Sequence, residues 1–218
     1  THVNEDILRS LMLSPPQLEK EKIDKQELKQ LLFNDTLYRM ECEEESQFAT
    51  IVEEVLRGKT LLVVDGMRAG ILLRTRSVGK RNVSEPETEK AVRGPREGFI
   101  EILGTNIGLL RYRLPNVNFR VKTVKIGRMT KSKVAYCYLE NVANPKLVKE
   151  VERRLSAIDI DAVMDTGYIE QFIEDHNSSP FPQVMNTERP DTTVSNMLEG
   201  RVAILMDGSP FALIVPAV

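Results

Sequence analysis

The fold is decided by a stretch that occurs twice in the chain. Residues 52–73 read VEEVLRGKTLLVVDGMRAGILL, and residues 194–215 read VSNMLEGRVAILMDGSPFALIV. At a constant offset of 142 residues, and without a gap, apolar positions align with apolar positions. The identical pairs include Gly58 and Gly200, Asp65 and Asp207, and Gly66 and Gly208. A repeat of this kind indicates two related structural units.

Each copy predicts the same order of elements. In the first copy, Phe48, Ile51, Val52, Val55 and Leu56 follow helical spacing, and a glycine then ends the helix. Two short apolar runs separated by an Asp-Gly turn follow, which is typical of a β-hairpin. We therefore expect an α/β (mixed α+β) fold with two related subdomains, each a small mixed sheet with helices and a terminal Asp-Gly β-hairpin.

The remaining periodicity places the other elements. We expect helices over 4–13, 22–33, 97–114, 145–155 and 161–175, and strands over 59–64, 71–75, 119–126 and 133–139. Gly104 and Gly108 on the third of these helices permit close backbone contact. We place the first subdomain at residues 1–126 and the second at 127–218.

A fainter echo joins Val3–Leu11 (VNEDILRSL) to Leu147–Leu155 (LVKEVERRL). The second of these helices follows the predicted strand 133–139, whereas nothing precedes the first. We therefore expect that the given sequence starts just after an opening strand of the first subdomain.

Composition limits the class of protein. The chain has 218 residues, of which 41% are hydrophobic and 28% charged, which excludes collagen, a coiled-coil rod and wholesale disorder. No apolar run approaches the roughly 20 residues of a membrane-spanning helix. Cys42 and Cys137 lie far apart in sequence and outside any Cys/His cluster, so we expect two reduced structural thiols.

The net charge of −2 conceals a strong segregation. Residues 1–57 carry 7 basic and 13 acidic side chains, residues 74–139 carry 15 and 5, and residues 140–218 carry 6 and 13. The cations of the middle segment could pair with the acidic flanks, or could meet an anionic partner. An anionic membrane surface attracts each nearby Lys or Arg by about 1 kcal/mol. The candidate residues for such a contact are Arg111, Arg113, Arg120, Lys122 and Lys125.

Nucleic acid is a poor partner for this basic segment, because no aromatic platform or reading helix accompanies it. Catalytic chemistry is also poorly represented. The two histidines, His2 and His176, have no partner at metal-ligand or catalytic spacing. We therefore expect no enzyme activity, no metal and no cofactor. The aspartates of the two Asp-Gly pairs are explained by turn geometry.

Residues 76–97 contain Gly79, Pro86, Gly94 and Pro95 and almost no periodic apolar residues. Loops of about 20 residues inside a compact domain are uncommon and are usually functional or disordered. This long loop is therefore the first candidate for a functional element.

Several strings in the chain resemble the GerA family, the A subunits of spore germinant receptors. They are 84–99 (SEPETEKAVRGPREGF), 165–175 (DTGYIEQFIED), 179–183 (SPFPQ), 187–191 (TERPD) and 198–211 (LEGRVAILMDGSPF). The resemblance covers essentially the whole chain. It implies the soluble N-terminal domain of a membrane subunit whose transmembrane region follows Val218 in the full protein.

The resemblance also implies the partners and the location. Family members act with B and C subunits in the spore inner membrane, where nutrients trigger germination, and this domain is expected on the cytoplasmic (spore core) side. The family's membrane region is thought to form an oligomeric ion channel, so other A subunits are further expected partners. Small-molecule binding is placed mainly in the B subunit.

Two functions follow from the resemblance. The first is a non-enzymatic domain for receptor assembly and signal coupling, and the alternative is a nutrient sensor with its site between the subdomains. For the first function, the candidate coupling and partner-contact residues are Arg93, Gly94, Pro95, Arg96, Glu97 and Phe99.

Overall fold

The computed structural model describes residues 42–74, 86, 88–89, 94–175 and 181–217. The chain divides into two compact units, Thr1–Val78 and Gly79–Val218, each of which is described by itself. The helices predicted over 4–13 and 22–33, the echo at Val3–Leu11 and most of the loop 76–97 lie outside the described residues.

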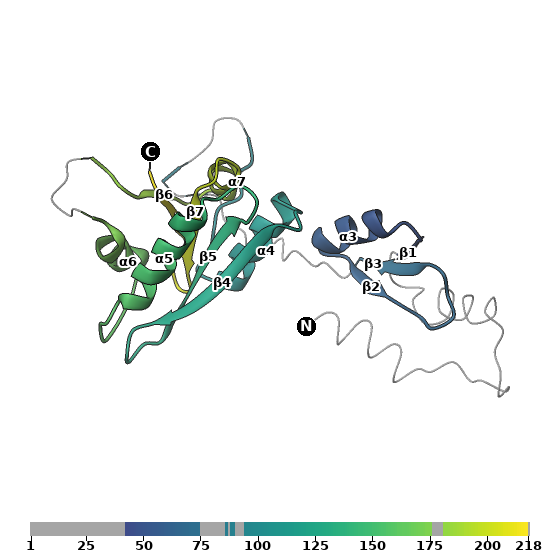
Figure 1. The fold of residues 1–218 in the computed structure, drawn as a ribbon, viewed down its shortest axis with the longest axis horizontal. Helices are drawn as coiled ribbons and strands as arrows, with labels where there is room; N and C mark the ends of the chain where they lie inside the picture. The colour runs from purple at the N-terminus through teal and green to yellow at the C-terminus, as the bar shows by residue number, and fades with distance from the viewer. Residues whose placement is uncertain (1–41, 75–85, 87, 90–93, 176–180, 218) are drawn as a thin grey trace. The chain divides into compact units, whose positions relative to one another are not determined.

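The described residues of the first unit, 42–74, form a three-stranded antiparallel sheet and one helix (Figure 1). Its elements are β1 (Cys42–Glu45), α3 (Phe48–Leu56), β2 (Thr60–Leu62) and β3 (Gly70–Leu73), and the strand order is β1-β3-β2. Gly58, at a φ of 99°, follows the end of α3. The fully buried side chains of Ile71 and Leu73 on the central strand form the core of this small sheet.

The second unit is built on a five-stranded antiparallel sheet in the order β4-β5-β7-β8-β6. Its strands are β4 (Phe119–Ile126), β5 (Ser132–Leu139), β6 (Met185–Thr187), β7 (Val202–Met206) and β8 (Ala212–Val215). Its helices are α4 (Leu103–Arg113), α5 (Pro145–Ala157), α6 (Thr166–Ile173) and α7 (Pro190–Leu198).

Both faces of this sheet are buried, which explains why its inner strands are apolar without a break. Successive side chains of a strand point to opposite faces. On β5, Tyr136 therefore packs on the face covered by α5 and α6, and its neighbour Cys137 packs on the face covered by α4 and α7. The second unit thus has three layers, with a pair of helices on each side of the sheet (Figure 1).

The structure confirms the repeat. In the first unit Thr60 pairs with Leu73, and 142 residues later Val202 pairs with Val215 in the same antiparallel register. Gly66 and Gly208 in the two Asp-Gly turns adopt positive φ values of 82° and 93°, which glycine accepts without strain.

The repeat extends further toward the N-terminus than the sequence alignment did. Helix α3 and helix α7 start and end at equivalent positions. The pairing of Glu43 with Leu72 between β1 and β3 is equivalent to that of Met185 with Ile214 between β6 and β8. The strand order β1-β3-β2 therefore repeats as β6-β8-β7.

The predicted fold class is confirmed as mixed α+β, with two small antiparallel sheets and five helices among the described residues. Two expectations need correction. Every strand pair of the described residues is antiparallel, so neither sheet is mixed. The division lies between Val78 and Gly79 and not between residues 126 and 127, because β4 pairs with β5 along its whole length and α4 packs against α7.

Two helices are shorter than predicted. The helix expected over 97–114 starts at Leu103, and the one expected over 161–175 spans Thr166–Ile173. The second is shortened because Ile160 and Asp161 accept backbone hydrogen bonds from the turn between β4 and β5, at N···O distances of 2.9 and 2.8 Å.

Glycine substitutions test the helix ends. Gly200→Ala should lower the free energy of unfolding by about 1–2 kcal/mol, because the residue has a φ of 93° and the new Cβ would lie 3.1 Å from the Val142 carbonyl oxygen. Gly104→Ala should raise it by about 0.5–1 kcal/mol, because this glycine lies in a helix with open space around it. Urea unfolding followed by tyrosine fluorescence measures both free energies of unfolding. Equal changes in the two variants would contradict the assignment of Gly200 to a strained position and Gly104 to an open helical one.

Candidate functional site

The described residues of the predicted loop 76–97, together with residues 98–102, pack along the chain where β6 ends and α7 begins. The backbone N–H of Phe99 donates to the carbonyl oxygen of Glu188 at 2.8 Å. The backbone N–H of Thr88 donates to the Glu188 carboxylate at 3.2 Å. The Glu188 side chain is thereby removed from solvent, with only 6% of the residue exposed. We call the described residues of this stretch, 86, 88–89 and 94–102, the docked segment.

Glu89 makes the reciprocal contact. Its Oε2 accepts from the Thr187 hydroxyl at 2.7 Å and from the Glu188 backbone N–H at 3.1 Å. A carboxylate that accepts hydrogen bonds forms stronger bonds than a neutral acceptor. The docked segment is therefore fixed to Thr187 and Glu188 by backbone and side chains of both partners.

Arg189 lies beside the same contact. Its guanidinium donates to both oxygens of Asp191, from Nε at 3.1 Å and from Nη2 at 2.5 Å. The position that a Cβ of Gly94 would occupy is 3.9 Å from Arg189 Nη2, and Gly94 has a φ of +119°. Burial alone would raise the pKa of Asp191, but the Arg189 hydrogen bond and charge outweigh it, and the pKa is lowered. The Arg189–Asp191 pair therefore stays ionised near neutral pH.

The docked segment continues into α4 through side-chain hydrogen bonds. Asn106 is fully buried; its Oδ1 accepts from the Ile100 N–H at 2.9 Å, and its Nδ2 donates to the Ile100 carbonyl oxygen. Asp207 Oδ1 accepts from the Leu103 N–H at 3.0 Å, which satisfies one of the free amides at the start of α4. These bonds explain why residues 97–102 lie outside the helix.

The turn Asp207-Gly208-Ser209 also contacts the start of α6. The Ser209 hydroxyl donates to Asp165 Oδ1 at 2.8 Å. The oxygen of the Thr166 hydroxyl lies 3.2 Å from the oxygen of the Ser209 hydroxyl. Burial alone would raise the pKa of Asp165, but the bond from Ser209 and the bonds at the helix start outweigh it and lower the pKa. The hydroxyls of Ser209 and Thr166 and the carboxylate of Asp165 therefore fix the N-terminal end of α6. Within the described ranges, no cluster of three or more His, Cys, Asp or Glu side chains could hold a metal ion.

The predicted coupling residues differ in their environments. Gly94, Pro95 and Arg96 are exposed, and Arg93 lies outside the described residues. Glu97 pairs with Arg113 at 2.7 Å. Phe99 is 2% exposed and packs in the core with α4 and α7, so its side chain anchors the docked segment and is not presented to a partner.

The predicted anionic-surface residues are divided between α4 and β4. Arg120 pairs with Glu140, and Lys122 pairs with Glu152 at 3.3 Å and lies 5.9 Å from the centre of the Tyr136 ring. Together with the Glu97 pair of Arg113, three of the five cations are matched by carboxylates. Arg111 and Lys125 are exposed. The segregated charge of the sequence is therefore partly neutralised in space.

Both cysteines are free thiols. Cys137 is fully buried in the sheet, and burial raises the pKa of its thiol to about 12, so it is not a reactive thiolate at neutral pH.

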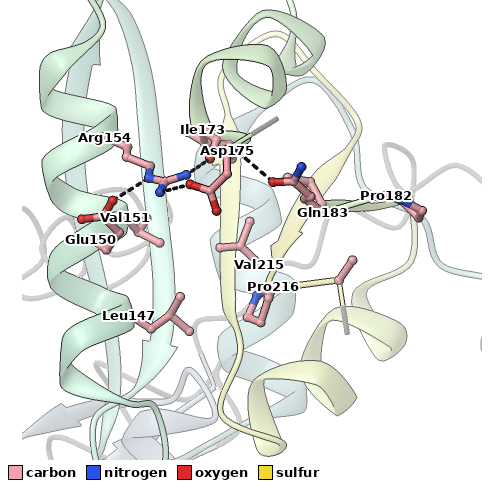
Figure 2. Close-up of a pocket in the computed structure, with 12 residues that line it drawn as sticks. Leu147, Glu150, Val151, Arg154, Ile173, Asp175, Pro182, Gln183, Val215 and Pro216 are labelled. Atoms are coloured by element: carbon pink, nitrogen blue, oxygen red, sulfur yellow. Dashed lines mark hydrogen bonds and ion pairs between the residues drawn. The ribbon is translucent and has the colours of Figure 1, made fainter. Parts of the chain in front are cut away.

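A pocket of about 400 Å³ lies elsewhere in the second unit, between α5 and the end of β8 (Figure 2). Its lining residues are Leu147, Glu150, Val151, Arg154, Ile173, Asp175, Pro182, Gln183, Val184, Val215, Pro216 and Ala217. Arg154 reaches across the pocket from α5 to Asp175 (Figure 2).

Sequence reasoning did not select Glu89, Asn106, Thr187, Glu188 or Asp207 as site residues. Asn106 had a detectable signal, since it is a polar residue within the apolar stripe of a predicted helix. Asp207 was explained by turn geometry alone, and its bond to α4 depends on a contact between residues more than 100 positions apart.

Comparison with known proteins agrees with this architecture. The GerA family, described as Bacillus/Clostridium GerA spore germination protein, matches residues 1–218. Spore germination protein B1 of Bacillus subtilis (strain 168) is 46% identical over 172 residues, covering 79% of this chain and 36% of that protein. Spore germination protein KA of the same strain is 38% identical over 205 residues, covering 94% of this chain and 38% of that protein.

A solved structure matches as well. The N-terminal domain of the A subunit of the Bacillus megaterium spore germinant receptor GerK3 superimposes with a TM-score of 0.71 at 33% identity, covering 99% of this chain and 78% of that one. The protein is thus a receptor-subunit domain by class. The chain belongs to the GerA family of spore germination proteins, as an N-terminal domain of an A subunit.

The chain spans between a third and two fifths of the length of these two relatives. Within the described residues, no helix is both long and apolar enough to cross a membrane.

The buried amide of Asn106 gives the first test of the site. Asn106→Ala should lower the free energy of unfolding by about 1–3 kcal/mol, because the N–H and C=O of Ile100 lose their partners. Hydrogen exchange should accelerate at Ile100. Asn141→Ala, at an exposed turn position, is the matched control. Unchanged protection of Ile100 would show that Asn106 does not fix the docked segment.

The contact of Asp165 with Ser209 predicts a pH dependence. Because the pKa of Asp165 is lowered in the folded protein, its stabilisation is present above the unfolded-state pKa of about 4 and is lost as the pH falls below it. Asp165→Asn should therefore reduce the difference in urea midpoint between pH 6 and pH 3. Asp161→Asn, an exposed carboxylate paired with Arg128, is the comparison. An equal reduction of this midpoint difference in both variants would contradict the predicted role of Asp165 in the pH dependence.

Proposed function

We propose that this domain contributes to receptor assembly and signal coupling in nutrient-triggered spore germination, without enzymatic activity. The observation that carries the proposal is the attachment of the docked segment to Thr187 and Glu188 through Thr88 and Glu89. This attachment joins the described residues of a charged loop to the start of α7, and residues 101–103 to the β7–β8 turn. A displacement of the loop would thereby move the helices on both faces of the sheet, α4 and α7 on one and α5 and α6 on the other.

Coupling requires an element with two arrangements whose balance a distant event can shift. The docked segment suits this role, because hydrogen bonds and a single buried aromatic anchor, Phe99, hold it in place. Gly94, Pro95 and Arg96 of this segment are exposed. A germinant-driven shift elsewhere in the receptor would release or tighten this segment.

Assembly is supported by apolar side chains that the second unit leaves exposed. Met164, Tyr168 and Phe172 follow one another at four-residue spacing along α6 and its N-terminal flank, with exposures of 69%, 47% and 46%. Tyr168 and Phe172 both lie within α6 and, being four residues apart, share one helix face. Exposed apolar patches of this kind commonly mark protein–protein contacts.

The proposed partners are the B and C subunits, the membrane region of the same subunit and other A subunits. We place the full protein in the spore inner membrane with this domain on the cytoplasmic (spore core) side. The names of the relatives support a receptor context, and one relative, YfkQ of Bacillus subtilis, is named as a membrane protein. A contact of Arg111 and Lys125 with an anionic membrane surface stays a prediction, as does the nutrient site between the subdomains.

Charge reversal on the docked loop tests the coupling proposal. In the full-length subunit, Arg93→Glu combined with Arg96→Glu should impair nutrient germination while receptor abundance in spores is unchanged, because both residues belong to the proposed coupling element and Arg96 is exposed. Lys149→Glu on the exposed side of α5 is the matched charge reversal. Normal germination of the double variant at normal abundance would refute the coupling role.

A further inference from the structure

The pocket between α5 and the end of β8 has a composition that selects a ligand. Apolar side chains come from both of its walls, Leu147 and Val151 from α5 and Val215 and Pro216 from the opposite side (Figure 2). Val151 and Val215 are themselves buried. A volume of about 400 Å³ lies within the usual range of about 300–1,000 Å³ for small-molecule sites.

The charges of the pocket are already matched to one another. Arg154 donates from Nε to Glu150 at 2.7 Å, and its two terminal nitrogens donate to the Ile173 carbonyl oxygen and to Asp175. Arg153 also donates to Glu150, and the two arginines lower the pKa of Glu150 to about 2, so this carboxylate stays ionised near neutral pH. A charged ligand would have to break or crowd one of these pairs, which is costly when one partner is left unmatched.

The polar end of the pocket still offers hydrogen-bond donors. A guanidinium carries five N–H groups. Three described acceptors, on Glu150, Ile173 and Asp175, use three of those of Arg154. Arg154 lines the pocket, and these three bonds leave two of its five N–H groups for another acceptor, such as the oxygen of a hydroxyl or carbonyl group.

We propose that this pocket binds a small, uncharged, mainly aliphatic molecule with one oxygen acceptor, its apolar body on Leu147, Val151 and Val215 and its oxygen toward Arg154. The site lies within the second unit, apart from the docked segment, and the proposal does not depend on the coupling function.

Three probes that share one cyclohexyl ring and differ in charge separate the alternatives. We would titrate the isotope-labelled 218-residue chain with cyclohexanol, cyclohexylammonium and cyclohexanecarboxylate and record backbone amide shifts by NMR. Cyclohexanol should give saturable shifts at Ile173, Val184 and Val215, and each charged analogue should bind at least about tenfold more weakly. Absence of saturable cyclohexanol binding, or equal binding of a charged analogue, would overturn the proposal.

Two variants localise the binding. Leu147→Trp should fill the pocket and abolish the cyclohexanol shifts, whereas Lys149→Trp on the exposed side of the same helix should leave them unchanged. Retained binding in folded Leu147→Trp protein would overturn the assignment to this pocket.

If Leu147→Trp does not fold, Gln183→Glu gives an independent test. This change keeps the acceptor that Asp175 N–H uses at 2.8 Å and adds one negative charge to the lining. Cyclohexylammonium should then bind at least as tightly as cyclohexanol. An unchanged order of affinities would overturn the proposal.

Discussion

The turn between β7 and β8, Asp207-Gly208-Ser209, fixes the other parts of the second unit. Asp207 accepts from the first amide of α4, the Gly208 N–H donates to the Glu101 carbonyl oxygen at 2.7 Å, and Ser209 donates to Asp165 before α6. One tight turn thereby positions a helix on each side of the sheet and the end of the docked segment. Gly208 makes this geometry accessible, since its φ of 93° is unfavourable for other residues.

The two units show how the same local sequence is used in different surroundings. Their hairpins share strand register, turn and helix limits. In the second unit α4 packs on α7, and Met197 is fully buried, whereas its equivalent Val55 in α3 is 41% exposed. The repeat therefore specifies the hairpin and its helix, and the elements packed around them differ from one unit to the other.

The charge distribution explains how a nearly neutral protein can present local charge without a uniform basic face. Acidic residues of the C-terminal third, such as Glu140 and Glu152, pair with cations of the basic middle segment across neighbouring elements. Exposed pairs of this kind contribute little to stability. Their effect is to neutralise Arg120 and Lys122 on β4.

The sequence by itself determined the repeat, the mixed α+β class, the Asp-Gly turns and the family, because these depend on local spacing and on strings of neighbouring residues. Only the tertiary structure decided where the units divide, because the pairing of β4 with β5 and the packing of α4 on α7 both join elements within Gly79–Val218. It also decided that Phe99 is buried, that Asp207 binds α4 and that Arg154 is matched by two carboxylates. Contacts such as Leu103 with Asp207 and Arg154 with Asp175 join residues far apart in the chain, and local patterns do not specify which of many polar side chains will meet.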